Sequence, residues 1–329
     1  MTDSTTRPPR QARRRAIGQP EIVALGVLAV LLGGRWIAPL LDVPTLQTWS
    51  TIFVAIVIQS TPFLVAGVVL SAFISILLSE RVLQRVVPKR PSLGVPVAGM
   101  AGIGLPGCEC AAVPIAGSLM RRGVAPAVAL TFLLAAPAVN PVVLVATAVA
   151  FPDTPLMWVA RFVASFSTAV LVGWWVLSRT GRLPIMNRAP ALDATASKRE
   201  RFVATVRHDF LHASGFLVLG GMIAAAVNSF VPPAVLDTLA GQALVGIVTM
   251  AFFAFIVALC SETDAFVAAS FTAFSDTAKL VFLVVGPAMD IKLAAMEAGT
   301  FGVPFARQFV PVVIGTAMVV ASLVGWWLL

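Results

Sequence analysis

Cysteines and acidic residues stand together at two interruptions of long apolar stretches. The first interruption reads Pro106-Gly107-Cys108-Glu109-Cys110 and the second reads Cys260-Ser261-Glu262-Thr263-Asp264. A carboxylate at membrane depth is costly unless it is paired, hydrated or protonated, so such residues are candidates for function. Thiolates favour soft metals and metalloids. The pattern predicts a site that binds a coupling proton or cationic group beside a thiophilic atom, formed by Cys108, Glu109, Cys110, Cys260, Glu262 and Asp264.

The same residues also have structural interpretations. Glu109 could cap a helix that restarts after the break at Pro106 and Gly107. Ser261 and Asp264 fit the Ser-x-x-acidic capping pattern. A cysteine by itself is commonly a small buried hydrophobe. The sequence leaves both interpretations open.

Two further polar residues follow prolines in later apolar stretches. Asn140 lies three residues after Pro137, and Asp290 lies three residues after Pro287. A proline inside a helix leaves a carbonyl oxygen without its usual N–H partner. The polar side chain either satisfies that kink or completes a contact with a cation or substrate.

The basic residues near these stretches have separate expectations. Arg161 lies a few residues inside an apolar stretch, where it either extends to the surface or neutralises an internal carboxylate. We expect Lys292 and Arg307 to anchor helix ends at the cytoplasmic face.

His208-Asp-Phe-Leu-His212 offers a rival chemistry. Two histidines at i and i+4 share a helical face, as in the H-E-x-x-H zinc motif. Here the shorter Asp209 replaces the general-base glutamate, and the chain has no further histidine as a third ligand. The pair fits better as solvent-exposed residues where a helix enters the membrane from its inner face. We therefore predict no metal and no cofactor.

The composition shows which elements must position these residues. Of 329 residues, 59% are hydrophobic and 12% are charged, whereas soluble proteins carry about a quarter charged residues. The apolar residues form blocks near the length of about 20 residues that crosses a bilayer. All seven tryptophans lie near block ends, where amphipathic rings prefer the headgroup layer. These features exclude an ordinary soluble globule and predict an all-α polytopic membrane protein.

The net charge of +8 does not indicate a nucleic-acid partner. The basic residues lie between apolar blocks, as in cytoplasmic loops of membrane proteins, and no nucleic-acid-binding motif accompanies them. No phosphate-binding Gly-Lys-Ser/Thr loop occurs either. We therefore expect a multi-pass protein of the plasma (inner) membrane with a cytoplasmic N-terminus.

Nine apolar blocks suggest eight or nine simple crossings, but the basic residues favour another topology. Nine crossings would send Arg121, Arg122 and the basic segment 179–207 outside, against the positive-inside rule. If blocks 94–120 and 242–273 are re-entrant hairpins, nearly all Lys and Arg fall on the cytoplasmic side. Irregular backbone at membrane depth is tolerated where protein buries it. The prediction is about seven full transmembrane helices plus two re-entrant hairpins.

An internal repeat supports this topology. Residues 59–67 align with residues 212–220 at an offset of 153, and Glu109 falls on Glu262 at the same offset. Residues 136–140 resemble residues 286–290 at an offset of 150. Because each unit makes three full crossings, the two units would have inverted topology, as in many secondary transporters.

The repeat and the charges together predict the organisation of the chain. The expected segments are a basic cytoplasmic tail (1–20), an extra transmembrane helix with an outer loop (21–50), permease repeat 1 (51–178), a basic cytoplasmic linker (179–208) and permease repeat 2 (209–329).

The motifs resemble the predicted permease family that includes bacterial organoarsenical efflux permeases. The resemblance covers about residues 50–300 and implies a polytopic inner-membrane permease. In the arsenical members membrane cysteines handle trivalent organoarsenicals, which implies that role for Cys108, Cys110 and Cys260. The family usually has Cys-Ser-x-x-Asp-Ala-Phe in its second half, so Asp264 matches its acidic residue and Glu262 is a local variation. The matching segments are Gln59-Ser-Thr-Pro-Phe-Leu64, Pro88-Lys89, Gly107-Cys-Glu-Cys110, Val113-Pro114, Phe132-Leu-Leu-Ala-Ala-Pro137, Asn140-Pro141 and Cys260-Ser-Glu-Thr-Asp-Ala-Phe266.

The sequence thus favours a secondary transporter that exports a small solute, with a thiophilic species such as an organoarsenical as a candidate substrate and a proton as a candidate coupling ion. Two alternatives stay open: a membrane-embedded thiol-redox or metal-dependent enzyme, and a noncatalytic subunit of a membrane complex.

Overall fold

Proline and glycine divide the apolar sequence into helices of two lengths. The structure is a computed structural model that describes residues 44–77, 90–104, 109–185, 197–230, 243–261 and 263–329. Within these ranges the regular structure is helical and no strand occurs. The predictions for residues 1–20, most of 21–50, Pro106, Gly107, Cys108 and Glu262 lie outside the described residues.

Within the described ranges, four helices are long and apolar enough to cross a membrane. They are α2 (Pro44–Leu77), α8 (Met157–Ser178), α9 (Lys198–Phe230) and α15 (Val303–Leu328). At about 1.5 Å per residue, the 22 residues of α8 suffice for a hydrocarbon layer of about 30 Å. The helices of the described ranges are therefore those of a polytopic membrane protein, as the composition predicts.

The other helices are short and follow one another in pairs separated by a break. The pairs are α4 (Pro91–Ala101) with α5 (Glu109–Arg121), α6 (Pro126–Ala135) with α7 (Pro141–Ala150), α11 (Ala243–Val257) with α12 (Asp264–Ser270), and α13 (Asp276–Ala288) with α14 (Ile291–Phe301). A 3₁₀ turn, η2 (Gly102–Gly104), follows α4. Proline occupies the first turn of α4, α6 and α7, where its missing N–H costs nothing.

Two of these breaks stand where the sequence analysis expects kinks. The second pair, α6 and α7, separates at residues 136–140, around Pro137, and the fourth separates directly after α13 ends at Ala288. Pro287 lies inside the last turn of α13 rather than in the break itself. The prolines therefore mark complete interruptions of the helix rather than bends.

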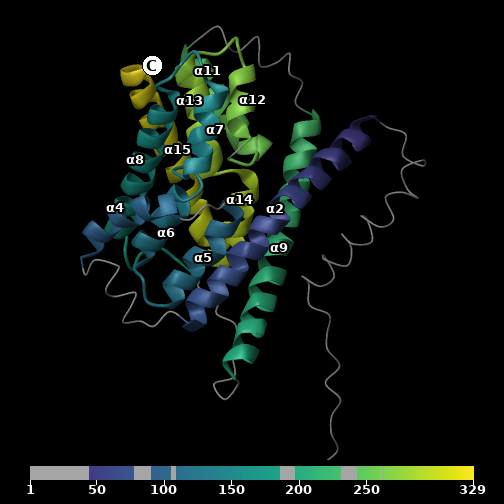
Figure 1. Ribbon diagram of the computed structural model, residues 1–329, viewed down its shortest axis with the longest axis vertical. Coiled ribbons are helices and arrows are strands. Elements are labelled where there is room, and N and C mark those ends of the chain that lie inside the picture. Colours follow the sequence, from purple (N-terminus) through teal and green to yellow (C-terminus); the bar gives the residue numbers. More distant parts are fainter. Residues whose placement is uncertain (1–43, 78–89, 105–108, 186–196, 231–242, 262) are drawn as a thin grey trace, which may run out of the picture.

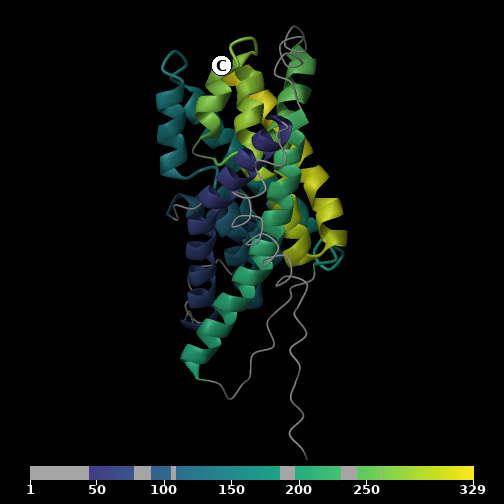
Figure 2. The ribbon, with the colours of Figure 1, turned by 90° about the vertical axis from the view of Figure 1, so that its right-hand side faces the viewer.

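The short helices occupy the two halves of the molecule (Figures 1 and 2). In the view of Figure 1, α4, α5 and α6 lie in the lower half, whereas α7, α11, α12 and α13 lie in the upper half. Helix α6 packs against α4, α5 and α8, while α13 packs against α11, α12 and α15. The start of α5, the segment after α11 and the start of α14 meet in space, because Lys292 contacts both Glu109 and the Ala258 carbonyl.

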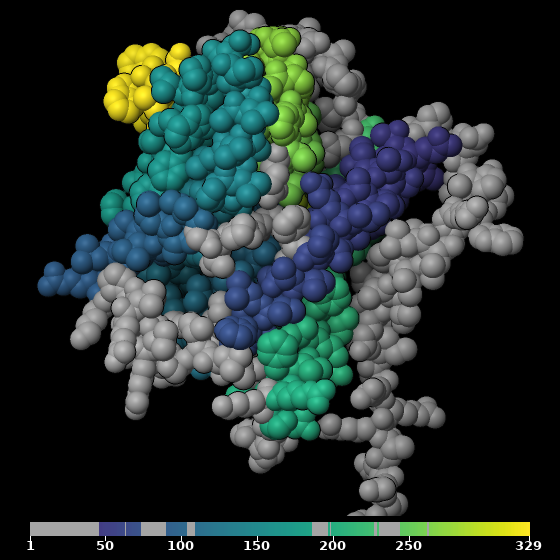
Figure 3. Space-filling model, in the orientation of Figure 1, coloured from purple at the N-terminus to yellow at the C-terminus, as the bar shows by residue number. Residues whose placement is uncertain are grey.

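Helices α2 and α9 pack along each other and close one side of this centre. Helix α2 runs obliquely across the visible face in the space-filling view (Figure 3). A Cβ built on Gly67 of α2 would lie 2.5 Å from Cα of Ala111 in α5, and one built on Gly220 of α9 would lie 2.7 Å from Cα of Lys292 in α14. Small residues allow such close approach of membrane helices. The two glycines thus hold α2 and α9 against the first turns of α5 and α14.

Candidate functional site

A buried lysine lies at the centre of the molecule with two acidic residues. The Lys292 Nζ is 2.9 Å from Glu109 Oε1 and 3.5 Å from Asp290 Oδ2. It also donates a hydrogen bond of 3.4 Å to the carbonyl oxygen of Ala258. The three charged side chains are at most 2% exposed. A buried ammonium requires such partners, because an unpaired ion in an apolar interior is costly.

Broken helices place these groups. Glu109 is the first residue of α5, where free backbone N–H groups favour a negative charge. Asp290 is the N-cap of α14, and its side chain accepts a hydrogen bond from the Leu293 N–H. Lys292 then falls in the first turn of the same helix. Ala258 ends the apolar stretch of α11 with a left-handed backbone (φ 52°). The positions of these three charged side chains and of the Ala258 carbonyl are therefore set by the start of α5, the start of α14 and the end of α11.

Ser261 gives Glu109 a second partner. Its hydroxyl donates to Glu109 Oε2 at 2.9 Å. Of the two interpretations that the sequence leaves open here, the structure does not show the capping pair of Ser261 and Asp264: α12 begins at Asp264, its N-cap is Thr263, and no side-chain cap bond forms. The physical reason is that Ser261 lies two residues before the N-cap Thr263, and its hydroxyl donates to the Glu109 carboxyl group instead of accepting from a backbone N–H of α12. Glu109 accordingly does more than cap a helix, since both of its oxygens bind groups from the second half of the chain.

Arg161 of α8 forms a second buried ion pair, with Asp264 at the start of α12. Its Nη2 lies 2.7 Å from Asp264 Oδ2, and its Nη1 donates to Thr147 Oγ1 at 2.7 Å. The Arg161 side chain is fully buried. Of the two expectations for this arginine, the structure selects neutralisation of an internal carboxylate.

The segment between α11 and α12 connects the two ion pairs. The Ser261 carbonyl accepts a hydrogen bond from Arg161 Nη2 at 3.3 Å, while the Ser261 hydroxyl donates to Glu109. Ala258 contributes its carbonyl to Lys292. A movement of this segment would therefore change the environment of both cations.

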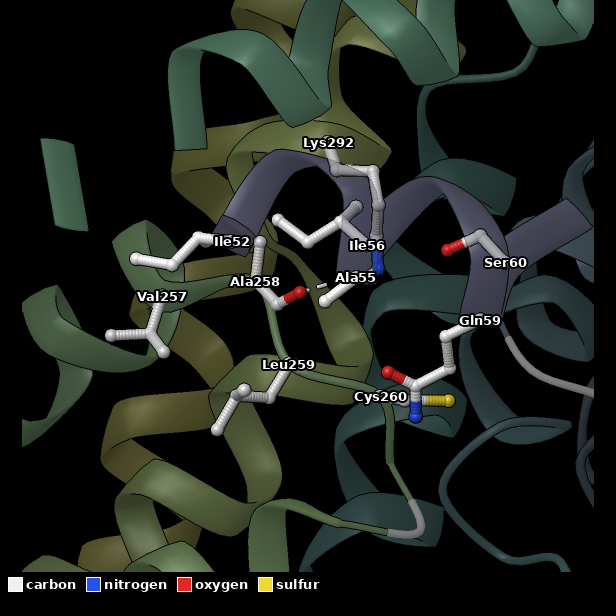
Figure 4. Close-up of a pocket in the computed structure, with 10 residues that line it drawn as sticks. All are labelled: Ile52, Ala55, Ile56, Gln59, Ser60, Val257, Ala258, Leu259, Cys260 and Lys292. Carbon is white, nitrogen blue, oxygen red and sulfur yellow. Dashed lines mark hydrogen bonds between the residues drawn. The ribbon is translucent and has the colours of Figure 1, made fainter. Parts of the chain in front are cut away.

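A cavity of about 300 Å³ lies between this segment and α2. Figure 4 shows Lys292 and Ala258 at its wall, with the Lys292 ammonium directed to the Ala258 carbonyl. Most of the remaining wall is apolar. The lining comprises Ile52, Ala55, Ile56, Gln59 and Ser60 of α2, Val257, Ala258, Leu259 and Cys260 of the break, and Lys292 of α14. The cavity offers a small solute one ammonium, one thiol, one amide and one hydroxyl.

The two described cysteines are both buried. Cys260 lines the cavity, and Cys110 lies in the first turn of α5 beside Glu109. Both belong to the same hydrophobic cluster. The structure brings them to the centre, as the sequence analysis expects, while Cys108 lies outside the described residues.

Asn140 and Asp290 occupy equivalent positions at the starts of α7 and α14. Asn140 Oδ1 accepts a hydrogen bond of 2.8 Å from the Val142 N–H. Each side chain thus caps its own helix after the break. Asp290 additionally contacts Lys292. Capping a helix is therefore compatible with a second contact at Asp290. The predicted opposition of Glu109 and Glu262 stays a prediction, because Glu262 lies outside the described residues.

The expectation for Lys292 was wrong. This residue is not a cytoplasmic anchor but the central cation, since α14 begins inside the protein rather than at a membrane face. The sequence contains one signal for it: Lys292 follows Asp290 by two residues, directly after a proline break. The sequence contains no comparable signal for the hydrogen bond from Ser261 to Glu109, because the two residues are 152 positions apart.

The histidine pair takes part in a different cluster. His208 Nδ1 lies 3.2 Å from Asp209 Oδ1, and His212 Nε2 lies 2.9 Å from the Gly299 carbonyl oxygen. Asp209 also pairs with Arg121 at 3.0 Å and accepts from the Ser71 hydroxyl at 3.2 Å. Among the described residues no group of three or more His, Cys, Asp or Glu could hold a metal ion. This cluster links α2, α5 and α9 instead.

Comparison with known proteins identifies the family. The family model ArsP_1, described as predicted permease, matches residues 45–326. The chain belongs to this predicted permease family. The permeases of this family are transporters rather than enzymes, which agrees with the resemblance found in the motifs.

Two relatives of the permease match over most of their length. UPF0718 protein YcgR of Bacillus subtilis is 31% identical over 284 residues, which cover 84% of this chain and 95% of the relative. A Streptococcus mutans protein, named as a candidate subunit of a two-component membrane permease complex, is 31% identical over 267 residues, covering 79% of this chain and 89% of the relative. No solved structure matches the chain.

Proposed function

We propose that this permease is a secondary transporter of the plasma membrane that exports a small solute through the cavity between α2 and the α11–α12 break. The observation that carries the proposal is the central group of Glu109, Asp290 and Lys292 beside that cavity. Charged groups buried in a membrane protein are costly and typically mark a substrate or ion path. Interrupted helices that meet near the centre are the usual site architecture of secondary transporters.

The proposed topology is seven full crossings and two re-entrant hairpins, in two inverted repeats at residues 51–178 and 209–329. Equivalent packing supports it: α6 lies among α4, α5 and α8, and α13 lies among α11, α12 and α15. In this arrangement the α4–α5 hairpin enters from the cytoplasm and the α11–α12 hairpin enters from outside. The tail 1–20 and the linker 179–208 are then cytoplasmic.

The proposed substrate is thiophilic, with a trivalent organoarsenical as the first candidate. A soft arsenic atom prefers thiolate ligands, and Cys260 lines the cavity while Cys110 is buried nearby. Cys108 would complete the set. The cavity volume of about 300 Å³ is at the small end of ligand pockets. It suits a methylated metalloid better than a large metabolite.

Replacing Cys260 by serine tests the substrate. In cells without other arsenical exporters, we expect wild-type permease to protect against methylarsenite and C260S to lose that protection, because the hydroxyl is a poor ligand for arsenic. The matched control is S270A, which alters an exposed serine on α12. Equal membrane levels are verified by immunoblot. Full protection by C260S would refute a thiol-bound substrate.

A second candidate function is a subunit role. The name of the Streptococcus mutans relative favours it, because that protein is described as part of a two-component membrane permease complex. Methylarsenite transport by the purified chain alone in lipid vesicles would exclude the need for a partner. Transport that requires co-expressed membrane proteins would favour the subunit role.

A further inference from the structure

Glu297 of α14 is a buried carboxyl group that the site does not use. Its side chain has no exposed area. Both carboxyl oxygens lack a hydrogen-bond partner among the described residues. A group of this kind requires an explanation, because buried polar atoms in native proteins are nearly always satisfied.

The other buried acidic side chains of the described ranges all have partners. Glu109 contacts Lys292 and Ser261, and Asp264 contacts Arg161. Asp290 caps α14 and contacts Lys292, while Asp209 pairs with Arg121. Glu297 differs from them because neither of its carboxyl oxygens has a hydrogen-bond partner among the described residues.

Among the described residues, no cation of the neighbouring helices forms a salt bridge with Glu297. Helix α14 packs against α5, α9 and α15. Arg121 of α5 is engaged by Asp209, and His212 of α9 contacts the Gly299 carbonyl. Asp290 lies two helical turns before Glu297 on the same face. These helices carry the following titratable and charged groups with described side chains. Helix α5 has Glu109, Cys110 and Arg121, and helix α15 has the exposed Arg307. Helix α9 has Arg199, Glu200, Arg201, Arg207, His208, Asp209 and His212, and Lys292 lies on α14 directly after its N-cap Asp290.

These surroundings favour the neutral form of Glu297. An ionised carboxylate without partners in an apolar interior costs far more than the neutral acid. The negative charge of Asp290 on the same helix face opposes ionisation further. The carboxyl group therefore retains its proton in the conformation described.

We propose that Glu297 is the proton-binding site that couples this permease to the proton gradient. In the buried state the carboxyl group holds a proton. When α14 moves and water reaches the side chain, the O–H bond breaks, the proton passes to water and a carboxylate remains. A proton from the opposite side reverses the step. This inference rests on the proposed transport function and assigns the proton to Glu297 instead of Glu109.

The position of Glu297 explains how the substrate would control it. Lys292 lines the cavity and belongs to the same short helix, five residues before Glu297. Because Lys292 and Glu297 lie on the same helix of 11 residues, we expect a ligand that displaces Lys292 to shift Glu297 as well. Such a shared element is the physical requirement for coupling between two sites.

Infrared spectroscopy of the purified full chain tests the protonation directly, with no substrate needed. We expect wild type to show a carboxyl C=O band of a protonated acid at neutral pH, and E297Q to lose that band. The matched control is E200Q, which removes an exposed glutamate, and it should retain the band. Absence of the band in wild type, or its persistence in E297Q, would overturn the proposal.

Transport in reconstituted vesicles tests the coupling. The measured quantity is the ratio of methylarsenite accumulation with and without an imposed pH gradient. We expect a ratio above one for wild type and E200Q and a ratio of one for E297Q. A wild-type ratio in E297Q contradicts the coupling role. If wild type moves no methylarsenite, the proposed substrate fails, and the infrared band still decides whether Glu297 carries a proton.

Discussion

At the scale of single residues, the permease keeps its buried charges in pairs that join distant parts of the chain. Lys292 contacts Glu109, and Arg161 contacts Asp264. Such pairs give less net stability than their short distances suggest, because both ions lose their hydration. Removing one member of a buried pair lowers stability strongly, because the other member is then left as an uncompensated charge.

Replacing Arg161 by methionine should therefore destabilise the protein by about 3–5 kcal/mol. The double variant R161M/D264N should recover most of that loss, because it removes both charges. The measurement is the free energy of unfolding of the purified protein by denaturant titration in detergent.

The matched control for this prediction is K279M. Lys279 pairs with Asp276 three residues away, and Asp276 is 39% exposed. A surface pair of this kind is worth about 0–1 kcal/mol. If R161M were no more destabilised than K279M, the Arg161 pair would not be the buried contact described.

At the scale of helices, close packing at two glycines sets the positions of the charged groups. A Cβ at Gly220 would meet the backbone of Lys292 at 2.7 Å. Backbone atoms cannot move aside as a flexible side chain can, so α9 would have to shift away from α14. The ion pair of Lys292 with Glu109 depends on this contact.

Replacing Gly220 by alanine should lower stability by about 1–3 kcal/mol through overpacking, which exceeds the gain of about 1 kcal/mol in helix propensity. Gly215 lies on the same helix with nothing within 4 Å of a built Cβ. G215A should therefore keep or slightly raise stability. Thermal melting of both variants in detergent measures the difference, and equal melting temperatures would contradict the close contact.

Sequence reasoning could locate the helix breaks but not the partners of the residues in them. Proline and glycine act through the local backbone, so the interruption at residues 136–140 was predictable. The pairing of Arg161 with Asp264 spans 103 positions and arises from packing between helices. Lys292 was misassigned for the same reason: its position depends on where α14 begins within the fold.

At the scale of the whole molecule, the ionic contacts divide into a central group and one group toward each end. Arg161 and Asp264 join α8 to α12, which lie in the upper part of Figure 1. Arg121 and Asp209 join α5 to α9 in the lower part. The cavity lies between them, beside Lys292. Under the proposed alternating access, we expect α2 to part from α5 in the opposite state.

A crosslink between α2 and α5 tests this expectation. The Ser118 hydroxyl donates to the backbone carbonyl of Ser71 at 2.7 Å. The two hydroxyl groups also share a donor, because Arg121 Nη2 lies 3.4 Å from Ser71 Oγ and 3.3 Å from Ser118 Oγ, so the two side chains adjoin at this contact. In the double variant S71C/S118C we expect oxidation to stop methylarsenite transport in vesicles and a reductant to restore it. The single variants under the same oxidant control for oxidation of the native cysteines. Because a disulfide would fix α2 against α5, unimpaired transport by the crosslinked protein would mean that this contact stays closed throughout the cycle, and the solute would then need a path that does not open between these helices.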